Sequence, residues 1–136
     1  RTTLAKQLAL YVVLYSPMQM AADLPENYEG DPAFQFVRDV AVDWEQTRVL
    51  EGEVGDYVVV ARQMRGSQEW FLGAITDEEA RTFDLPLSFL PAGQRFVAEG
   101  YADGPGAHWR DNPLPVVISE QEVDADSVLV LQLAPG

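Results

Sequence analysis

The chain has 136 residues, a size typical of one domain that buries roughly two thirds of its unfolded surface. Its 22 acidic and 9 basic residues give a formal net charge of −13. Such a charge repels nucleic-acid phosphates and anionic lipid head groups, so we expect neither nucleic acid nor membrane as a partner. The chain has no cysteine, which excludes disulfide frameworks, zinc–thiolate sites and cysteine nucleophiles.

The first segment, residues 1–15, has a helical pattern. Its apolar residues follow the spacing i, i+4, i+7, i+8 and i+11 from Leu4. From about Ala9 onward further apolar residues fill the remaining faces, which indicates a helix buried on more than one side. Since a small β domain covers one side only, we expect this chain to belong to a longer protein. The longest apolar run, residues 8–15, is shorter than the roughly 20 residues that span a bilayer.

The next segment contains two proline-based helix starts. Ser16 followed by Pro17 predicts a second helical segment over residues 17–23, because serine caps a helix and proline suits its first position. Residues 24–32 break the helix, and Asp31 with Pro32 predicts another short helix to about residue 37.

From residue 39 the pattern alternates. The predicted strands are 47–54, 56–64, 69–76, 81–90, 95–102, 114–122 and 127–133. Turns are expected at Gly55 and near Gly66, and Pro86 indicates an edge or a bulge. Short strands with no helical pattern between them predict a mainly β fold, an antiparallel two-sheet β-sandwich preceded by an N-terminal helical segment. We place the helical segment in residues 1–30 and the β domain in residues 31–136.

The only cluster that resembles a binding site is the loop that contains the single histidine. It consists of His108, Trp109, Arg110, Asp111 and Asn112. A sugar ring could stack on Trp109 while the neighbouring polar groups bond its hydroxyls. The alternative is a loop pinned by a partly buried tryptophan, surrounded by ordinary loop residues. Both interpretations stay open at this stage.

Catalytic and metal chemistry lack a convincing pattern. The acidic pairs, which are Glu78 with Glu79, Glu51 with Glu53, and Asp124 with Asp126, lie beside predicted turns, where solvated charge is expected. The segment 124–126 lacks the glycine and the downstream bidentate glutamate of a calcium loop. We therefore assign no catalytic residue and no metal ligand to this chain.

Several separated motifs, in order, resemble the C-terminal end of the family 97 glycoside hydrolases. They are TLAKQLALYVVLYSPMQMAADLPENYE, FQFVRDVAVDWEQTRVLEGEVGDYVVVAR, EWFLGAITDEEAR, LSFLPAG and YADG. The resemblance implies that residues 1–30 correspond to the last helix of a (β/α)8 barrel and its exit, and residues 31–136 to a C-terminal β-sandwich. Such enzymes are bacterial α-glucosidases and α-galactosidases of the periplasm.

The resemblance implies a non-catalytic accessory domain, because the family's catalytic carboxylates and calcium ligands lie in the barrel, upstream of Arg1. The expected partners are that catalytic barrel and further copies of the chain. The expected location is periplasmic or secreted. The alternative function is a carbohydrate-binding module that uses the Trp109 loop. If the chain acts alone, we expect Leu8, Val12 and Tyr15 to lie in a dimer interface or to fold back onto the sheet.

Overall fold

The computed structural model describes residues 2–136, which form two compact units. One unit, here called the N-terminal unit, is Lys6–Ile75. The other, the C-terminal unit, is Thr76–Gly136 together with the residues up to Ala5. The chain was expected to divide into residues 1–30 and 31–136. The compact units instead separate after Ile75, and the expected domain division stays a prediction.

The N-terminal unit contains three helices, α1 (Leu4–Val13, whose first two residues belong to the C-terminal unit), α2 (Pro25–Tyr28) and α3 (Phe34–Asp39). The expected helix over residues 17–23 is absent, so that prediction is wrong. The Ser16 hydroxyl instead accepts a hydrogen bond from the Met18 N–H at 3.2 Å and donates one to the Met18 carbonyl at 2.5 Å. This local turn competes with helix formation.

The strands of the N-terminal unit are β1 (Trp44–Glu53), β2 (Tyr57–Met64) and β3 (Trp70–Thr76, whose last residue falls in the C-terminal unit), in the sheet order β1-β2-β3. The expected turns at Gly55 and Gly66 are confirmed, and both glycines have positive φ angles of 95° and 71°. Strand β1 lies at the edge of this sheet and its register against β2 shifts twice. Such shifts interrupt the regular pairing of the two strands, as β-bulges do.

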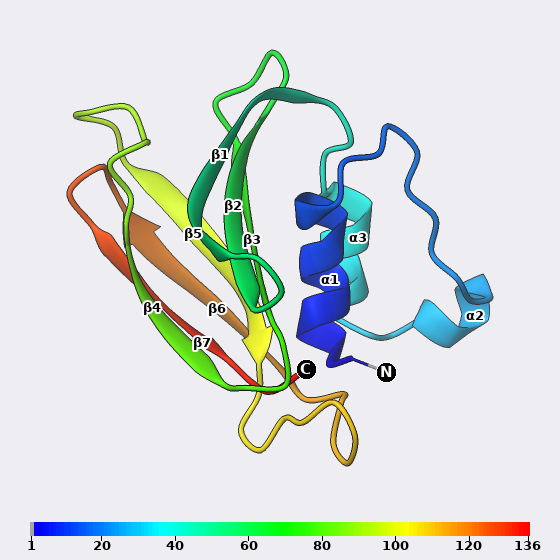
Figure 1. The fold of residues 1–136 in the computed structure, drawn as a ribbon. Helices are drawn as coiled ribbons and strands as arrows, with labels where there is room; N and C mark the ends of the chain where they lie inside the picture. The colour runs from blue at the N-terminus through cyan, green and yellow to red at the C-terminus, as the bar shows by residue number, and fades with distance from the viewer. Residues whose placement is uncertain (1) are drawn as a thin grey trace. The chain divides into compact units, whose positions relative to one another are not determined.

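Helix α1 packs closely on β3 through a glycine. A Cβ atom at Gly73 would lie 2.9 Å from both the Ala9 carbonyl oxygen and the Val12 Cβ. Figure 1 shows α1 and α3 along one side of the β1-β2-β3 sheet. The core of this unit consists of Val12, Val40, Ala41 and Trp44. Trp44, the first residue of β1, is therefore buried in the core of this unit.

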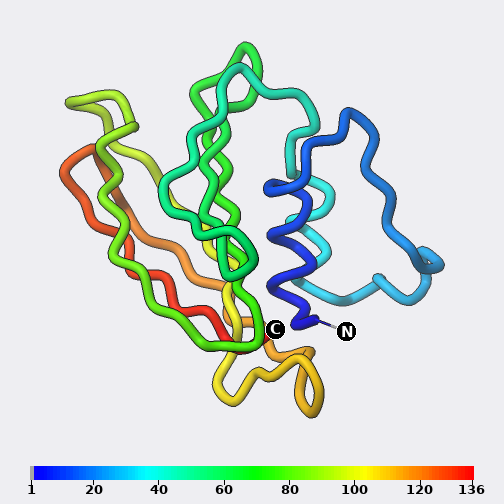
Figure 2. Tube along the Cα trace, in the orientation of Figure 1, coloured from blue at the N-terminus to red at the C-terminus, as the bar shows by residue number. Residues whose placement is uncertain are grey.

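The C-terminal unit consists of two antiparallel strand pairs. Strand β4 (Arg81–Pro86) pairs with β7 (Val128–Leu133), and β5 (Phe96–Asp103) pairs with β6 (Val116–Val123). The trace of this unit is drawn in Figure 2. Each observed strand overlaps a predicted one, and the prediction of a mainly β, antiparallel fold behind an N-terminal helix is confirmed.

Candidate interaction surfaces

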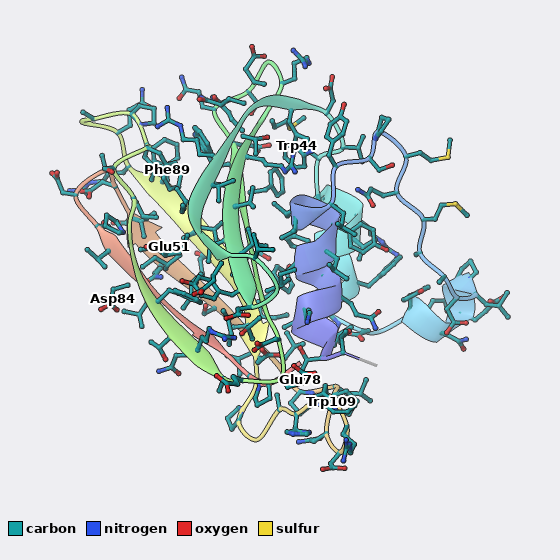
Figure 3. The ribbon with its side chains drawn as sticks, viewed as in Figure 1. Trp44, Glu51, Glu78, Asp84, Phe89 and Trp109 are labelled. Carbon is teal, nitrogen blue, oxygen red and sulfur yellow. The ribbon has the colours of Figure 1, made fainter. Side chains whose placement is uncertain are left out.

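The five loop residues predicted as a ligand site, residues 108–112, lie consecutively in the C-terminal unit, and Figure 3 labels Trp109 among them. His108 and Asn112 form an isolated antiparallel bridge, with N–H···O distances of 3.0 Å and 3.1 Å. The Asn112 side-chain amide donates to the Gly106 carbonyl at 3.1 Å, and the Arg110 N–H donates to His108 Nδ1 at 3.2 Å. Several polar groups of the loop therefore form hydrogen bonds within the loop itself.

The Trp109 ring is contacted by both of its neighbours. The His108 ring stacks on it with centroids 5.8 Å apart, and the Arg110 guanidinium lies 4.6 Å from its centroid. The backbone N–H of Trp109 donates a hydrogen bond to the Pro135 carbonyl at 3.2 Å. The geometry thus fits a pinned loop at least as well as a sugar platform, and Asp111 remains exposed. Ligand binding here stays a prediction.

The three helix residues expected at an interface separate in the structure. Leu8 and Val12 are buried within this chain, so neither side chain is available to a second chain. Val12 packs against β3 at Gly73, as the fold-back alternative requires. Of the three, Tyr15 is exposed, and the expected interface stays a prediction.

Arg62 on β2 holds the end of α1. Its side chain is buried, with 8% of the residue exposed. The guanidinium donates to the Val13 carbonyl at 3.1 Å and to Thr47 Oγ1 at 3.0 Å. It also lies 5.8 Å from the ring centroids of both Tyr15 and Trp44. A cation beside the last carbonyls of a helix stabilises that helix end, and burial lowers the pKa of Arg62.

Sequence reasoning missed an exposed apolar segment that follows α1. We call it the apolar strip, and it consists of Leu14, Tyr15, Met18, Met20 and Leu24. All five side chains are exposed, Met18 at 74% and Met20 at 80%. The Tyr11 hydroxyl donates to the Met20 carbonyl at 3.3 Å, which ties the strip to α1. The exposed strip was missed because a helix was predicted over residues 17–23. The two closely spaced methionines were the sequence feature that could have indicated an exposed apolar segment.

A second exposed surface lies on the C-terminal unit. We call it the outward β4–β7 face, and it consists of Thr82, Asp84, Pro86, Val128, Val130 and Gln132. All six residues are exposed, and Figure 3 shows Asp84 projecting outward from β4. The sequence signal for this surface is the run Val128–Leu133. Its first four residues are all apolar, so both faces of the strand carry apolar side chains.

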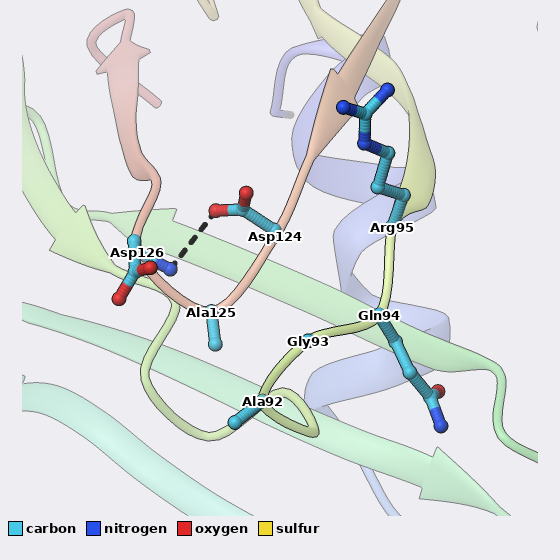
Figure 4. Close-up of a pocket in the computed structure, with 7 residues that line it drawn as sticks. All are labelled: Ala92, Gly93, Gln94, Arg95, Asp124, Ala125 and Asp126. Carbon is cyan, nitrogen blue, oxygen red and sulfur yellow. Dashed lines mark hydrogen bonds between the residues drawn. The ribbon is translucent and has the colours of Figure 1, made fainter.

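The C-terminal unit also contains a shallow cavity of about 250 Å³ between two turns (Figure 4). Asp124 Oδ1 accepts hydrogen bonds from the Asp126 N–H and the Ser127 hydroxyl, both at 3.0 Å. These hydrogen bonds stabilise the turn, so Asp124 Oδ1 has little remaining ability to accept a hydrogen bond from a ligand. Within residues 2–136, no three histidine or acidic side chains gather closely enough to hold a metal ion. No helix in that range has the length and apolar character needed to cross a membrane.

One carboxylate of the C-terminal unit has a strongly altered pKa. Asp77 forms an ion pair and hydrogen bonds with Arg81, and its carboxylate also accepts the Glu79 N–H at 2.9 Å. The Arg81 contact lowers the pKa of Asp77 to about 2. Because the partners are an arginine and a backbone amide beside a strand start, this shift reflects stabilisation of the turn between β3 and β4.

Comparison with known proteins identifies the family. Residues 43–136 match the family described as "Glycosyl-hydrolase 97 C-terminal, oligomerisation". The chain is 36% identical over 135 residues to a retaining alpha-galactosidase of Bacteroides thetaiotaomicron, covering 98% of this chain and 20% of that protein. It is also 36% identical over 84 residues to a probable retaining alpha-galactosidase of Streptomyces bingchenggensis, covering 61% of this chain and 13% of that protein.

Solved structures agree with this result. The chain matches a glycoside hydrolase family 97 enzyme from a Pseudoalteromonas species, in complex with panose, with a TM-score of 0.95 and 53% identity. The same enzyme in complex with acarbose gives the same values, and each match covers 98% of this chain and 21% of that one. The chain thus spans about one fifth of the length of the Bacteroides thetaiotaomicron protein and of the Pseudoalteromonas enzyme. It belongs to the family of C-terminal oligomerisation domains of the family 97 glycoside hydrolases.

Proposed function

We propose that this chain packs against the catalytic part of a parent α-glycosidase and joins copies of that parent into a homo-oligomer. The observation that carries the first half is the apolar strip. Its large side chains face solvent in a chain that spans one fifth of its relatives' length. Surfaces of this kind mark interaction sites, because exposed apolar groups gain stability when a partner covers them.

The size of the effect supports a stable contact. Full burial of one large apolar side chain contributes roughly 1.5–3 kcal/mol. Five such side chains in the strip would therefore contribute several kilocalories per mole even after ordering costs are subtracted. The two methionines are flexible and polarizable, which suits an irregular protein surface.

The parent's chemistry is proposed from its relatives. The curated relatives are named alpha-galactosidases, and a solved relative was captured with panose. We propose that the parent hydrolyses α-glucosides or α-galactosides and works in the periplasm or as a secreted protein. Calcium is proposed for the catalytic barrel. Chelation should then lower the parent's activity and leave the melting temperature of this chain unchanged.

Methionine oxidation tests the proposed docking. Hydrogen peroxide oxidises exposed methionines in preference to covered ones. Peptide mass spectrometry would measure oxidation of Met18 and Met20 in this chain alone and in the longer parent protein. We expect oxidation of both residues to slow at least about tenfold in the parent, whereas Met64, exposed at 36%, serves as the internal reference.

Equal oxidation of Met18 and Met20 in the two proteins would contradict the docking proposal. A second assay addresses the accessory role. The chain alone should show no hydrolysis of aryl α-glucosides or aryl α-galactosides, with or without calcium. Turnover that disappears when one carboxylate is replaced would overturn the non-catalytic assignment.

The alternative function is carbohydrate binding at the Trp109 loop. It is favoured by the exposed groups Arg110, Asp111 and Asn112 beside an aromatic ring. Calorimetry with a maltooligosaccharide and with melibiose would decide. Binding that is lost in Trp109→Ala supports the alternative, and no binding at millimolar sugar rejects it.

A further inference from the structure

We propose that the outward β4–β7 face is the surface through which two copies of this chain associate. The inference rests on the proposed homo-oligomer and deepens it by assigning the contact to named residues. In the ladder, Pro86 lies opposite Val128, Asp84 opposite Val130, and Thr82 opposite Gln132. Residues directly opposite each other in an antiparallel pair point to the same side, so these six side chains form one face.

Half of this face is apolar, namely Pro86, Val128 and Val130, at positions that are usually polar on a solvent-exposed sheet. Val128 is exposed at 58% and Val130 at 57%. Their neighbours Leu129 and Leu131 point the other way and are partly buried. A strand that borders solvent on one side normally alternates apolar and polar residues. The departure from this alternation at two successive outward positions indicates a surface that is covered in the assembled protein.

The charge of the chain restricts the surfaces through which two copies can meet. Two copies with a net charge of −13 each repel one another, so they associate best through a surface with few carboxylates. The outward β4–β7 face has one, Asp84.

The other described strands are less suitable. The β5–β6 pair exposes Glu99 directly opposite Glu120, and Glu122 nearby. Strand β1 exposes three glutamates, Glu45, Glu51 and Glu53. Two copies that met through either surface would bring several carboxylates together, whereas the β4–β7 face brings in only Asp84 of each copy.

The geometry suits a two-fold contact. Identical subunits most often form a dimer in which the same patch of each copy meets itself. Two sheets pack face to face about 10 Å apart through their outward side chains. A standard interface contributes about 800 Å² per partner, and a patch of six strand residues is smaller. We therefore expect weak, concentration-dependent dimers.

Single cysteines provide a direct test, because the chain contains none. Val130→Cys would be treated with a short bismaleimide at micromolar protein concentration. We expect covalent dimers from this variant. Val49→Cys is the matched control, since Val49 is also an exposed strand valine, at 67%, on the acidic strand β1. Equal dimer yields from the two variants would overturn the assignment.

Sedimentation equilibrium provides the second measurement. Val128→Glu should raise the dimer dissociation constant at least about tenfold, because it places like charges at the contact. Val128→Thr keeps the β-branched shape that strands favour and should raise it less. Val49→Glu should leave it unchanged. Circular dichroism would confirm that each variant is folded.

The outcomes separate this inference from the proposed function. A dimer that survives both Val128 substitutions refutes the face and leaves oligomerisation through another surface. A monomer at all concentrations, in this chain and in the parent, refutes the face and the proposed homo-oligomer together. Neither result bears on the docking of the apolar strip, which methionine oxidation tests separately.

Discussion

The apolar strip and the outward β4–β7 face are both exposed and apolar, yet they are built differently. The strip lies in a segment without regular structure, and its methionine, leucine and tyrosine side chains have many rotamers. The face lies on a paired ladder and presents stiff, β-branched valines in fixed register. A flexible segment can adapt to a partner of different shape, whereas a fixed ladder suits an identical copy. The difference indicates two partners for the two surfaces.

The two regions also differ in what holds them in place. The strip follows α1, which is fixed by a close contact at Gly73 and by the buried guanidinium of Arg62. The outward β4–β7 face is held in place by the pairing of β4 with β7. Strand β4 begins at Arg81, which forms an ion pair with Asp77. Changes at these anchors should therefore act on one region and spare the other.

The largest effect is expected for Gly73→Ala. The added methyl group would lie 2.9 Å from a backbone oxygen and from the Val12 Cβ, so helix and strand must move apart. We expect the free energy of unfolding to fall by about 1–3 kcal/mol, as measured by urea denaturation. Hydrogen exchange should increase in α1 and β3 and stay unchanged in β4 and β7.

Gly52→Ala is the control for Gly73→Ala, because a Cβ atom at Gly52 meets no atom closer than 3.7 Å. It should change stability by less than about 0.5 kcal/mol. Equal stabilities of the two variants would show that α1 does not depend on the close approach at Gly73.

A smaller effect is expected for Arg62→Ala. This change removes two hydrogen bonds and leaves the Val13 carbonyl without its guanidinium donor. Relief from burying a charge offsets part of the loss, so we expect a decrease of about 1–2 kcal/mol in the free energy of unfolding. Oxidation of Met18 should be unchanged or faster. Arg48→Ala, on the exposed strand β1, is the control, and an equal decrease there would contradict the special role of Arg62.

The smallest effect is expected for Asp77→Asn, and it should be present above about pH 4 and disappear in acid. The pKa of Asp77 in the folded chain is about 2, below the ordinary value of about 3.9 for an unfolded aspartate. The folded state therefore binds this proton less readily, and the carboxylate stabilises the fold above about pH 4. That contribution is lost as the pH falls towards 2.

Thermal melts between pH 5 and pH 2 would test this prediction. Asp77→Asn should reduce the dependence of the melting temperature on pH, whereas Asp84→Asn, on the outward face, should retain it. An unchanged acid profile in Asp77→Asn would mean that the Arg81 contact contributes nothing to the turn.

The strands could be predicted from sequence because their signal is local. Alternation over residues 81–90 predicts β4, and Gly55 and Gly66 mark the turns on either side of β2. The helix expected over residues 17–23 failed because a serine–proline pair is compatible with both a cap and a tight turn. Local pattern could not decide between the two.

The candidate surfaces were harder to predict, because exposure depends on tertiary packing. Leu8 and Tyr15 lie on one helical stripe in the sequence, yet the first is buried and the second is exposed. Helix α1 ends at Val13. Tyr15 therefore lies beyond the helix and does not continue its apolar stripe. Val128 and Val130 could have been noticed, since a strand that is apolar on both sides requires a partner on both sides.

The two register shifts in β1 have a consequence for assembly. An edge strand with regular backbone groups can add a strand from a neighbouring molecule, and each addition offers a fresh edge to the next. Irregular spacing at residues 44–46 and 49–51 disrupts that template, so growth by edge addition is discouraged. Association through the flat face of a ladder closes on itself after two copies. The register shifts in β1 therefore disfavour growth of a fibre at this edge.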